Sequence, residues 1–234
     1  ITIPNKSKEK LIFGPTAVMP LYGRSADNIR DHRHVTAMLH RLVTTEYGVE
    51  VTPTLSFDER GHQVNDTMYF VAAMEEDKVA PKGCFPELGQ FLGKAGSFMW
   101  PESVVTEAAK ISPMKGTTVD GQETVGALRF ADKELAPKES VTYIVYMGAC
   151  KKGEKSLDLI APYMTKKAVD KAFKETKEYW LKKCNVKVHT GDKDFDEFMS
   201  WVAFQPELRR LFGCSFLPHH DYGKGGRGWR DLWQ

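Results

Sequence analysis

The sequence predicts a mainly β fold, an antiparallel β-sandwich followed by helices, and three observations carry this prediction. Short apolar runs rich in Val, Thr, Tyr and Phe recur between about residues 10 and 150. Stretches of turn-forming residues separate these runs. At about residue 162 the spacing of the apolar residues changes to a helical period. We therefore expect a β domain first and helices after it.

Five apolar runs are the expected strands: "LIFGPTAVMPLYG", "VEVTPTLSF", "TMYFVAAM", "TVGALRF" and "VTYIVYMGA". β-branched and aromatic side chains favour extended structure because they fit a pleated, half-buried surface. Turn signals such as "DERGH", "APKG" and "VDGQE" lie between the runs. In "ELAPKES", Pro137 lies between two runs, where a missing amide donor costs little. Short strands with frequent turns are typical of an antiparallel sandwich.

The segment "TKKAVDKAFKETKEYWLKK" predicts one amphipathic helix. Charged residues occupy most of its other positions, and Thr165 is available as its N-cap. The face expected to pack consists of Val169, Phe173, Thr176 and Trp180. We assign residues 162–189 to a helical linker that includes the extended stretch "VKVHT".

A second helix is predicted to begin at "GDKDFDEF", where three acids place negative charge at the positive end of the helix dipole. These acids are Asp192, Asp194 and Asp196. The following residues, "FMSWVAFQPELRRLF", are apolar on more than one face, so we expect burial between other helices, with a kink at Pro206. We therefore expect a larger helical domain to begin near residue 190, of which this chain holds only the start, as part of a longer protein.

The composition excludes several classes of protein. The 234 residues contain 33 Lys and Arg against 31 Asp and Glu, so no global charge favours nucleic acid or an anionic membrane surface. The four cysteines are scattered without a C-x-x-C pair, which disfavours a zinc knuckle or a dense disulfide framework. We expect reduced thiols in a cytoplasmic protein. No apolar run is long enough to span a bilayer.

Three polar motifs are weak candidates for a site. His219 and His220 are adjacent, so in an extended segment they point to opposite faces, and we predict no metal site. "GKGGRG" lacks the spacing of a nucleotide-binding P-loop. Residues 27–42, "DNIRDHRHVTAMLHRL", collect three histidines and three arginines. They form either a solvated polar face or a contact with the helical domain, and the sequence leaves both open.

The tail "GKGGRGWRDLWQ" holds the strongest candidate. Arginines bring forks of donors, Asp231 brings two acceptors, and tryptophans offer flat surfaces on which a sugar ring can stack. This combination suits a polyhydroxylated ligand, although an Arg–Asp pair also serves structure in many proteins. On these grounds the predicted substrate-binding residues are Arg227, Trp229, Arg230 and Asp231, with Trp233 as a second flat surface.

The order of these segments resembles the disaccharide and oligosaccharide phosphorylases of glycoside hydrolase family 94. The resemblance rests on "ELAPKES", "KETKEYWLKK", "VKVHTGDKDFDEFMSWVAFQPELRR" and "GWRDLWQ", and it is closest from about Lys166 onward. It implies a β-supersandwich over residues 1–161, linker helices, and the start of an (α/α)6 catalytic barrel over residues 190–234. In the family the barrel opens with a segment like G-F-R-D-x-x-Q-D, which "GWRDLWQ" matches up to its glutamine. The resemblance therefore adds Gln234 to the predicted substrate-binding residues.

The resemblance also implies a reaction, the reversible phosphorolysis of a β-linked gluco-disaccharide or oligosaccharide with inversion. Inorganic phosphate is then a co-substrate, no cofactor is needed, and the general acid lies downstream of this chain, which would be inactive alone. Arg230 and Asp231 would hold hydroxyls of the nonreducing-end sugar. A further family arginine corresponds to Gly225 here, so Arg227 or Lys224 would replace it from another backbone position. Family members are often homodimers, and we expect one here.

Two other functions stay open from the sequence. The chain could be a non-catalytic carbohydrate-binding or interdomain module whose sandwich supports assembly. It could also belong to a glycoside hydrolase with a similar sandwich and barrel, which would need a second catalytic carboxylate and no phosphate.

Overall fold

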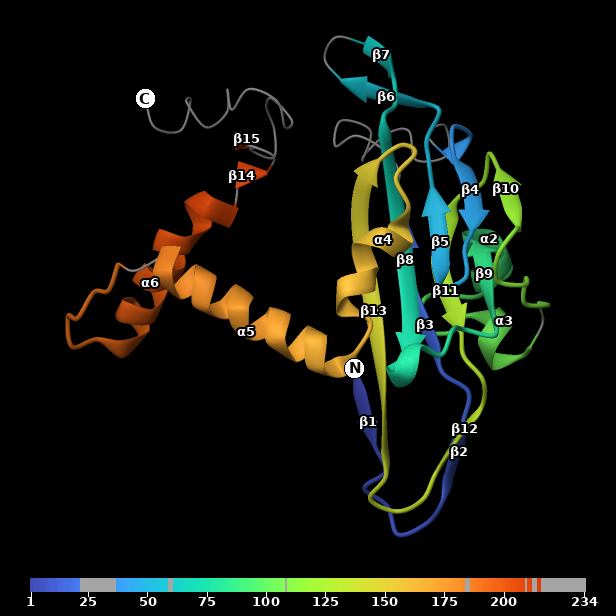
Figure 1. Ribbon diagram of the computed structural model, residues 1–234, viewed down its shortest axis with the longest axis horizontal. Coiled ribbons are helices and arrows are strands. Elements are labelled where there is room, and N and C mark those ends of the chain that lie inside the picture. The colour runs from blue at the N-terminus through green and yellow to red at the C-terminus, as the bar shows by residue number, and fades with distance from the viewer. Residues whose placement is uncertain are drawn as a thin grey trace. The chain divides into compact units, whose positions relative to one another are not determined.

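A computed structural model describes residues 1–21, 37–58, 61–107, 109–183, 186–208, 210–211 and 214–215. These residues are mainly β, with antiparallel sheets and a few helices, which confirms the predicted fold class at this level (Figure 1). The chain forms two compact units. The first comprises residues 1–57 and 62–169, and the second comprises residues 58–61 and 170–234.

The larger sheet of the first unit has six strands in the order β1-β13-β8-β5-β4-β10, and every pair is antiparallel. The longest pairing joins β8 to β13 and runs from Thr67 opposite Lys151 to Glu75 opposite Tyr143. The strands are β1 (Thr2–Pro4), β4 (Arg41–Thr44), β5 (Gly48–Val51), β8 (Thr67–Glu75), β10 (Thr118–Asp120) and β13 (Ser140–Lys151).

A second antiparallel sheet has three strands in the order β3-β11-β9. Its strands are β3 (Thr16–Leu21), β9 (Gly83–Glu87) and β11 (Thr124–Arg129). Three further strand pairs lie outside these sheets: β2 (Leu11–Phe13) with β12 (Lys133–Leu135), β6 (Leu55–Asp58) with β7 (Gly61–Val64), and β14 (Arg210–Leu211) with β15 (Cys214–Ser215). All five predicted runs contain strands, and Pro137 lies in the turn between β12 and β13 as predicted.

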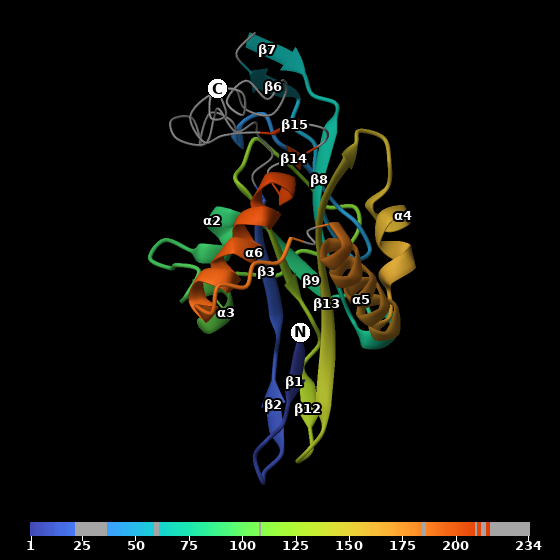
Figure 2. The same cartoon turned by 90° about the vertical axis from the view of Figure 1, so that its left-hand side faces the viewer.

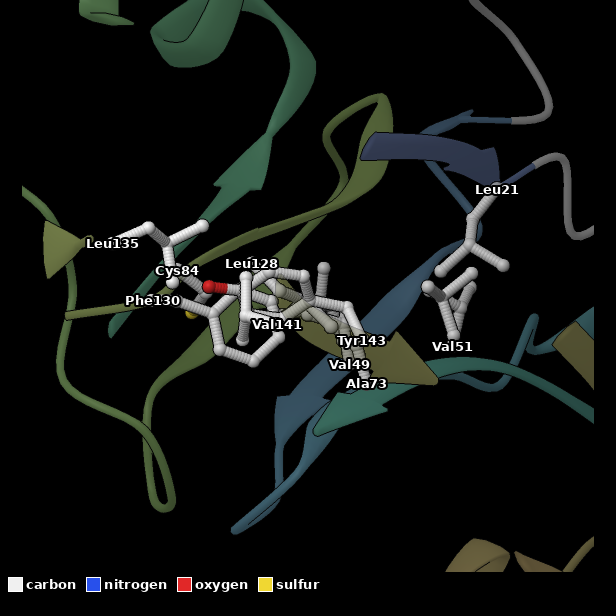
Figure 3. Close-up of a cluster of buried hydrophobic side chains, with 12 residues drawn as sticks. Leu21, Val49, Val51, Ala73, Cys84, Leu128, Phe130, Leu135, Val141 and Tyr143 are labelled. Atoms are coloured by element: carbon white, nitrogen blue, oxygen red, sulfur yellow. The ribbon is translucent and has the colours of Figure 1, made fainter. Parts of the chain in front are cut away.

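The two sheets pack face to face across one apolar cluster, which Figure 3 shows in part. Val49, Val51 and Ala73 come from the six-stranded sheet, whereas Leu21 and Leu128 come from the three-stranded sheet. The sheets approach so closely at Gly126 that a Cβ there would lie 2.5 Å from the Cβ of Val71. Only glycine fits this crossing without displacing the opposite strand.

Short helices cover the outer faces of both sheets. On the six-stranded sheet, Phe70 and Met74 pack with Ile160 of α4 (Ser156–Ile160) and with Met164, which directly follows the 3₁₀ turn η3 (Ala161–Tyr163). On the three-stranded sheet, a second cluster involves α2 (Leu88–Leu92) and α3 (Glu102–Val105) and consists of Phe85, Leu88, Phe91, Val125 and Ala127. Figure 2 shows α2 and α3 on one side of the sheets and α4 on the other. The first unit therefore has four layers.

Because both faces of the sheets are covered, the central strands are buried on both sides. Strand β8 alternates Phe70, Ala72 and Met74 toward one cluster with Val71 and Ala73 toward the other. A strand buried on both faces reads as a continuous apolar run. "TMYFVAAM" and "TVGALRF" are such runs, and both were predicted as strands.

Two longer helices follow, at the positions that the sequence predicts. Helix α5 spans Lys166–Lys183, and the hydroxyl of Thr165 accepts a hydrogen bond from the amide of Ala168 at 3.2 Å, which confirms Thr165 as its cap. Helix α6 spans Lys193–Leu208, with Asp194 and Asp196 in its first turn. A 3₁₀ turn, η2 (Glu76–Lys78), follows β8. Among the helices described, none is both long and apolar enough to cross a membrane.

Candidate functional site

The predicted sugar-binding residues lie outside the part of the chain that the structure describes. This holds for Arg227, Trp229, Arg230, Asp231 and Gln234, and equally for His219, His220, Lys224 and Gly225. Their proposed contacts with a sugar therefore stay predictions. The described residues instead define the scaffold that precedes them, together with one pocket and one exposed helix face that bear on function.

Helix α6 begins with a network of hydrogen bonds that fixes its N-terminus. The carboxylate of Asp192 accepts the amides of Asp194 and Phe195 at 3.0 and 3.1 Å, so Asp192 is the N-cap. The carboxylate of Asp196 accepts both the amide and the hydroxyl of Thr190, at 3.0 and 2.9 Å. The acidic cluster predicted at this helix start thus serves the structure of the helix, through caps as well as through the dipole.

One face of α6 is apolar and exposed to solvent. Phe195, Phe198, Trp201 and Val202 recur at intervals of three, three and one residues, which places them on one side of the helix. Phe198 is 58% exposed and Trp201 is 50% exposed. The sequence predicts burial of this segment by other helices of a larger domain, and that burial stays a prediction. The helix also continues past Pro206 to Leu208.

Helix α5 shows the same property more strongly, since none of its residues is buried. Val169 packs against the cluster on the outer face of the six-stranded sheet. Of the other residues expected to pack, Phe173 is 72% exposed. Tyr179 and Leu181 are also largely exposed. Trp180, the last residue of the predicted face, is partly buried and its ring lies edge-on to that of Tyr179.

The polar stretch at residues 27–42 is described from residue 37 onward. His40 is 4% exposed, and its Nδ1 lies 3.4 Å from the hydroxyl of Thr124 on β11. The next residue, Arg41, is exposed and lies 3.7 Å from the carboxylate of Asp120 on β10. Arg41 is the first residue of β4 and His40 directly precedes the strand, so their side chains point to opposite sides. A solvated polar face is therefore the wrong interpretation for His40, which is buried beside Thr124 of β11.

Cys84 and Cys150, the two cysteines whose side chains the structure describes, are free thiols. Burial raises the pKa of the Cys84 thiol to about 12, so it carries almost no reactive thiolate near neutral pH. The pKa of Cys150 is also raised, by burial first and then by Glu154 and Glu50. Neither thiol is suited to nucleophilic catalysis. Within the described residues, no group of three or more His, Cys, Asp or Glu side chains is placed to hold a metal ion.

A pocket of about 300 Å³ lies on the first unit. Its lining comes from the start of β9, the end of β11, helix α3 and the segment after α3, and it includes Lys82, Lys110, Arg129 and Glu107 among apolar residues. Sequence reasoning missed this pocket because its residues come from three separate parts of the chain and form no motif. The fold alone brings them together.

Comparison with models of known protein families finds none that matches this chain, and comparison with curated proteins finds no match either.

Proposed function

We propose that this chain is the N-terminal part of an inverting β-glucoside phosphorylase of the type found in glycoside hydrolase family 94. The observation that carries the proposal is the order of elements along the chain. Packed antiparallel sheets come first, then the capped amphipathic helix α5, then α6 with its acidic start, and then the motif "GWRDLWQ". This is the order that the family resemblance implies, with a β-supersandwich, linker helices and the opening of an (α/α)6 barrel.

The exposed face of α6 supports the same proposal. In water, apolar side chains at this spacing are ordinarily buried against another element. An exposed cluster of two phenylalanines, a tryptophan and a valine on one helix marks a contact surface. In the proposed enzyme, the remaining helices of the barrel cover this face.

The proposed chemistry needs one acid and a polar sugar cradle. Phosphate is already an anionic nucleophile, so a phosphorylase can omit the carboxylate base with which an inverting hydrolase activates water. Arg230 and Asp231 hold hydroxyls of the sugar next to the scissile bond, and Trp229 offers an aromatic plane. The general acid belongs to the barrel beyond this chain. Phosphate attacks the anomeric carbon as the acid protonates the departing glycosidic oxygen, which releases the aglycone and gives a sugar 1-phosphate.

The test is phosphate release from glucose 1-phosphate by the full-length protein in the presence of glucose and of β-linked gluco-oligosaccharides. We expect release that depends on the acceptor, and the product identifies the linkage. Phosphate-independent cleavage of β-glucans would instead identify a hydrolase. The absence of both activities, together with binding of the same sugars, would identify a carbohydrate-binding module.

A variant test addresses the site itself. Replacing Asp231 with Asn in the full-length protein keeps the size of the side chain and removes its charge. We expect kcat/KM to fall by at least about 100-fold, the order seen when one transition-state contact is lost. Asp170→Asn on the exposed helix α5 is a matched control, for which kcat/KM should stay unchanged. Unchanged kinetics in the Asp231 variant would remove this residue from the site.

A further inference from the structure

The pocket on the first unit combines an apolar wall with a rim of charged groups. Val104 and Ile111 are partly buried and pack against the cluster on the outer face of the three-stranded sheet. They line the pocket together with Phe85 and Ala109. Its volume of about 300 Å³ is at the lower end of the range of small-molecule sites. A ligand here is therefore a small molecule with an apolar part.

The walls of this pocket are held in place by hydrogen bonds. The backbone of Ser112 forms two hydrogen bonds with the backbone of Cys84, at 2.8 and 2.9 Å, which attaches the segment after α3 to β9. The side-chain amide of Gln90 donates to the carbonyl of Lys110 at 3.0 Å. The hydroxyl of Ser103 donates to the carbonyl of Phe91 at 2.6 Å. Because these contacts order the pocket in advance, a ligand does not have to order it on binding.

The three cations around the pocket differ in how strongly they are already paired. Arg129 is the most constrained, because its guanidinium donates to the carbonyl of Gly14 and, at 3.1 Å, to the carboxylate of Asp132. The ammonium of Lys82 lies 3.9 Å from the same carboxylate, at the limit of an ion pair. Lys110 has no ion pair with any described residue. Lys110 is thus the cation with all of its donors available, and Lys82 is the next.

The balance of charge favours an anion. Lys82, Lys110 and Arg129 stand against two carboxylates, those of Glu107 in the lining and Asp132 beside it. Near a partly enclosed surface an excess cation attracts an anion more strongly than it does in open water, because the effective dielectric constant is lower. An anionic group can therefore take the place of water at the ammonium groups of Lys110 and Lys82.

We propose that this pocket binds a small organic anion, a phosphate monoester or a carboxylate with an apolar body. Lys110 and Lys82 hold the charged group, and the body lies against Val104 and Ile111. Arg129 keeps Asp132 in place and adds positive potential without contacting the ligand directly. This site is made only of residues from the first unit, so the proposal does not depend on the proposed phosphorylase activity.

The experiment is an NMR titration of the ¹⁵N-labelled chain with three probes that separate charge from apolar contact. Phenyl phosphate carries both features, inorganic phosphate carries only the charge, and benzyl alcohol carries only the ring. We expect saturable shifts with phenyl phosphate at the amides of Gly83 and of residues 103–111. Inorganic phosphate should bind at least about fivefold more weakly, since the apolar contact is lost. Benzyl alcohol should cause no saturable shift.

Three lysine variants complete the experiment. Lys110→Gln should weaken phenyl phosphate binding by about fivefold or more, the effect of losing one partly screened charge contact. Lys82→Gln should weaken it less, because Asp132 already offsets this charge. Lys8→Gln, at an exposed lysine outside the pocket, is the matched control and should leave the affinity unchanged. The proposal is overturned if phenyl phosphate does not saturate, if its shifts fall outside the pocket, or if Lys110→Gln binds it as tightly as the unaltered chain.

Discussion

The two units of this protein contain similar apolar side chains but use them in opposite ways. In the first unit, strands β8 and β11 are buried on both faces, because each sheet packs against the other sheet on one face and against short helices on the other. In the helices that follow, α5 has no buried residue and α6 exposes a phenylalanine and tryptophan face. The comparison teaches that the first unit buries most of its large apolar side chains within itself. The helices leave apolar side chains exposed, where a further element can cover them.

The largest expected effect tests this comparison directly. Phe91 on α2 is only 1% exposed, so Phe91→Ala should lower the free energy of unfolding by about 3 to 5 kcal/mol. Phe173→Ala, the same substitution on α5, should change it by less than about 0.5 kcal/mol because Phe173 is exposed. Urea denaturation followed by circular dichroism measures both. Similar losses for the two variants would show that α5 is packed in solution.

A milder substitution at Phe91 keeps the stability test informative if Phe91→Ala does not fold. Phe91→Leu keeps most of the apolar volume and should cost less than Phe91→Ala. If both Phe91 variants were as stable as the unaltered chain, the apolar cluster that includes α2 would not contribute to stability.

The close approach of the two sheets gives the next effect. Gly126→Ala places a methyl group against Val71, where the facing strand leaves no room, and should lower the free energy of unfolding by about 1 to 3 kcal/mol. Gly89→Ala in α2 is the matched control, since the added methyl meets nothing closer than 3.4 Å. That control should be neutral or stabilising by up to about 1 kcal/mol. A neutral result for Gly126→Ala would mean that the sheets can separate at little cost.

High pH should destabilise the first unit through its buried thiol. Burial raises the pKa of Cys84 from 9.0 to about 12, so the unfolded chain loses this proton at lower pH than the folded chain does. The contribution of the protonated Cys84 thiol to the free energy of unfolding is complete below pH 9 and is lost as the pH rises toward 12. Between pH 9 and 10 the free energy of unfolding should fall by about 1 kcal/mol from this group.

The same denaturation experiment in Cys84→Ala isolates the contribution of the thiol. Tyr143 and Tyr146 also have pKa values raised to about 12, chiefly by burial, and they produce a similar decline from about pH 10. The difference in slope between the two proteins from pH 9 to 10 should therefore belong to Cys84. Equal slopes would contradict a raised pKa at this thiol.

The smallest effect concerns the start of α6. Asp192→Ala removes the acceptor for two backbone amides and should destabilise this helix by about 1 kcal/mol. Asp194→Ala keeps the cap and should cost roughly 0.5 kcal/mol or less, through the dipole alone. Hydrogen exchange of the α6 amides measures both. Protection factors that fall equally in the two variants would assign the whole effect to charge.

The sequence alone determined the features that depend on neighbouring residues. The apolar runs placed β8, β11 and β13, and helical spacing placed α5 and α6 with Thr165 at the first start. The sequence patterns do not predict strands such as β1 and β10 or the helices α2 and α3, which are only three to five residues long. Segments this short contain fewer than two repeats of the strand or helix period, so no pattern marks them.

Only the tertiary structure decided which groups from distant parts of the chain meet. The strand order of the six-stranded sheet, the burial of His40 beside Thr124, and the pocket around Lys110 all join residues far apart in sequence. The conformational preferences of neighbouring residues do not predict such contacts, because the contacts depend on how the sheets and helices pack on one another. The sequence likewise revealed that α6 has an apolar face, but it took the folded chain to show that this face is left exposed.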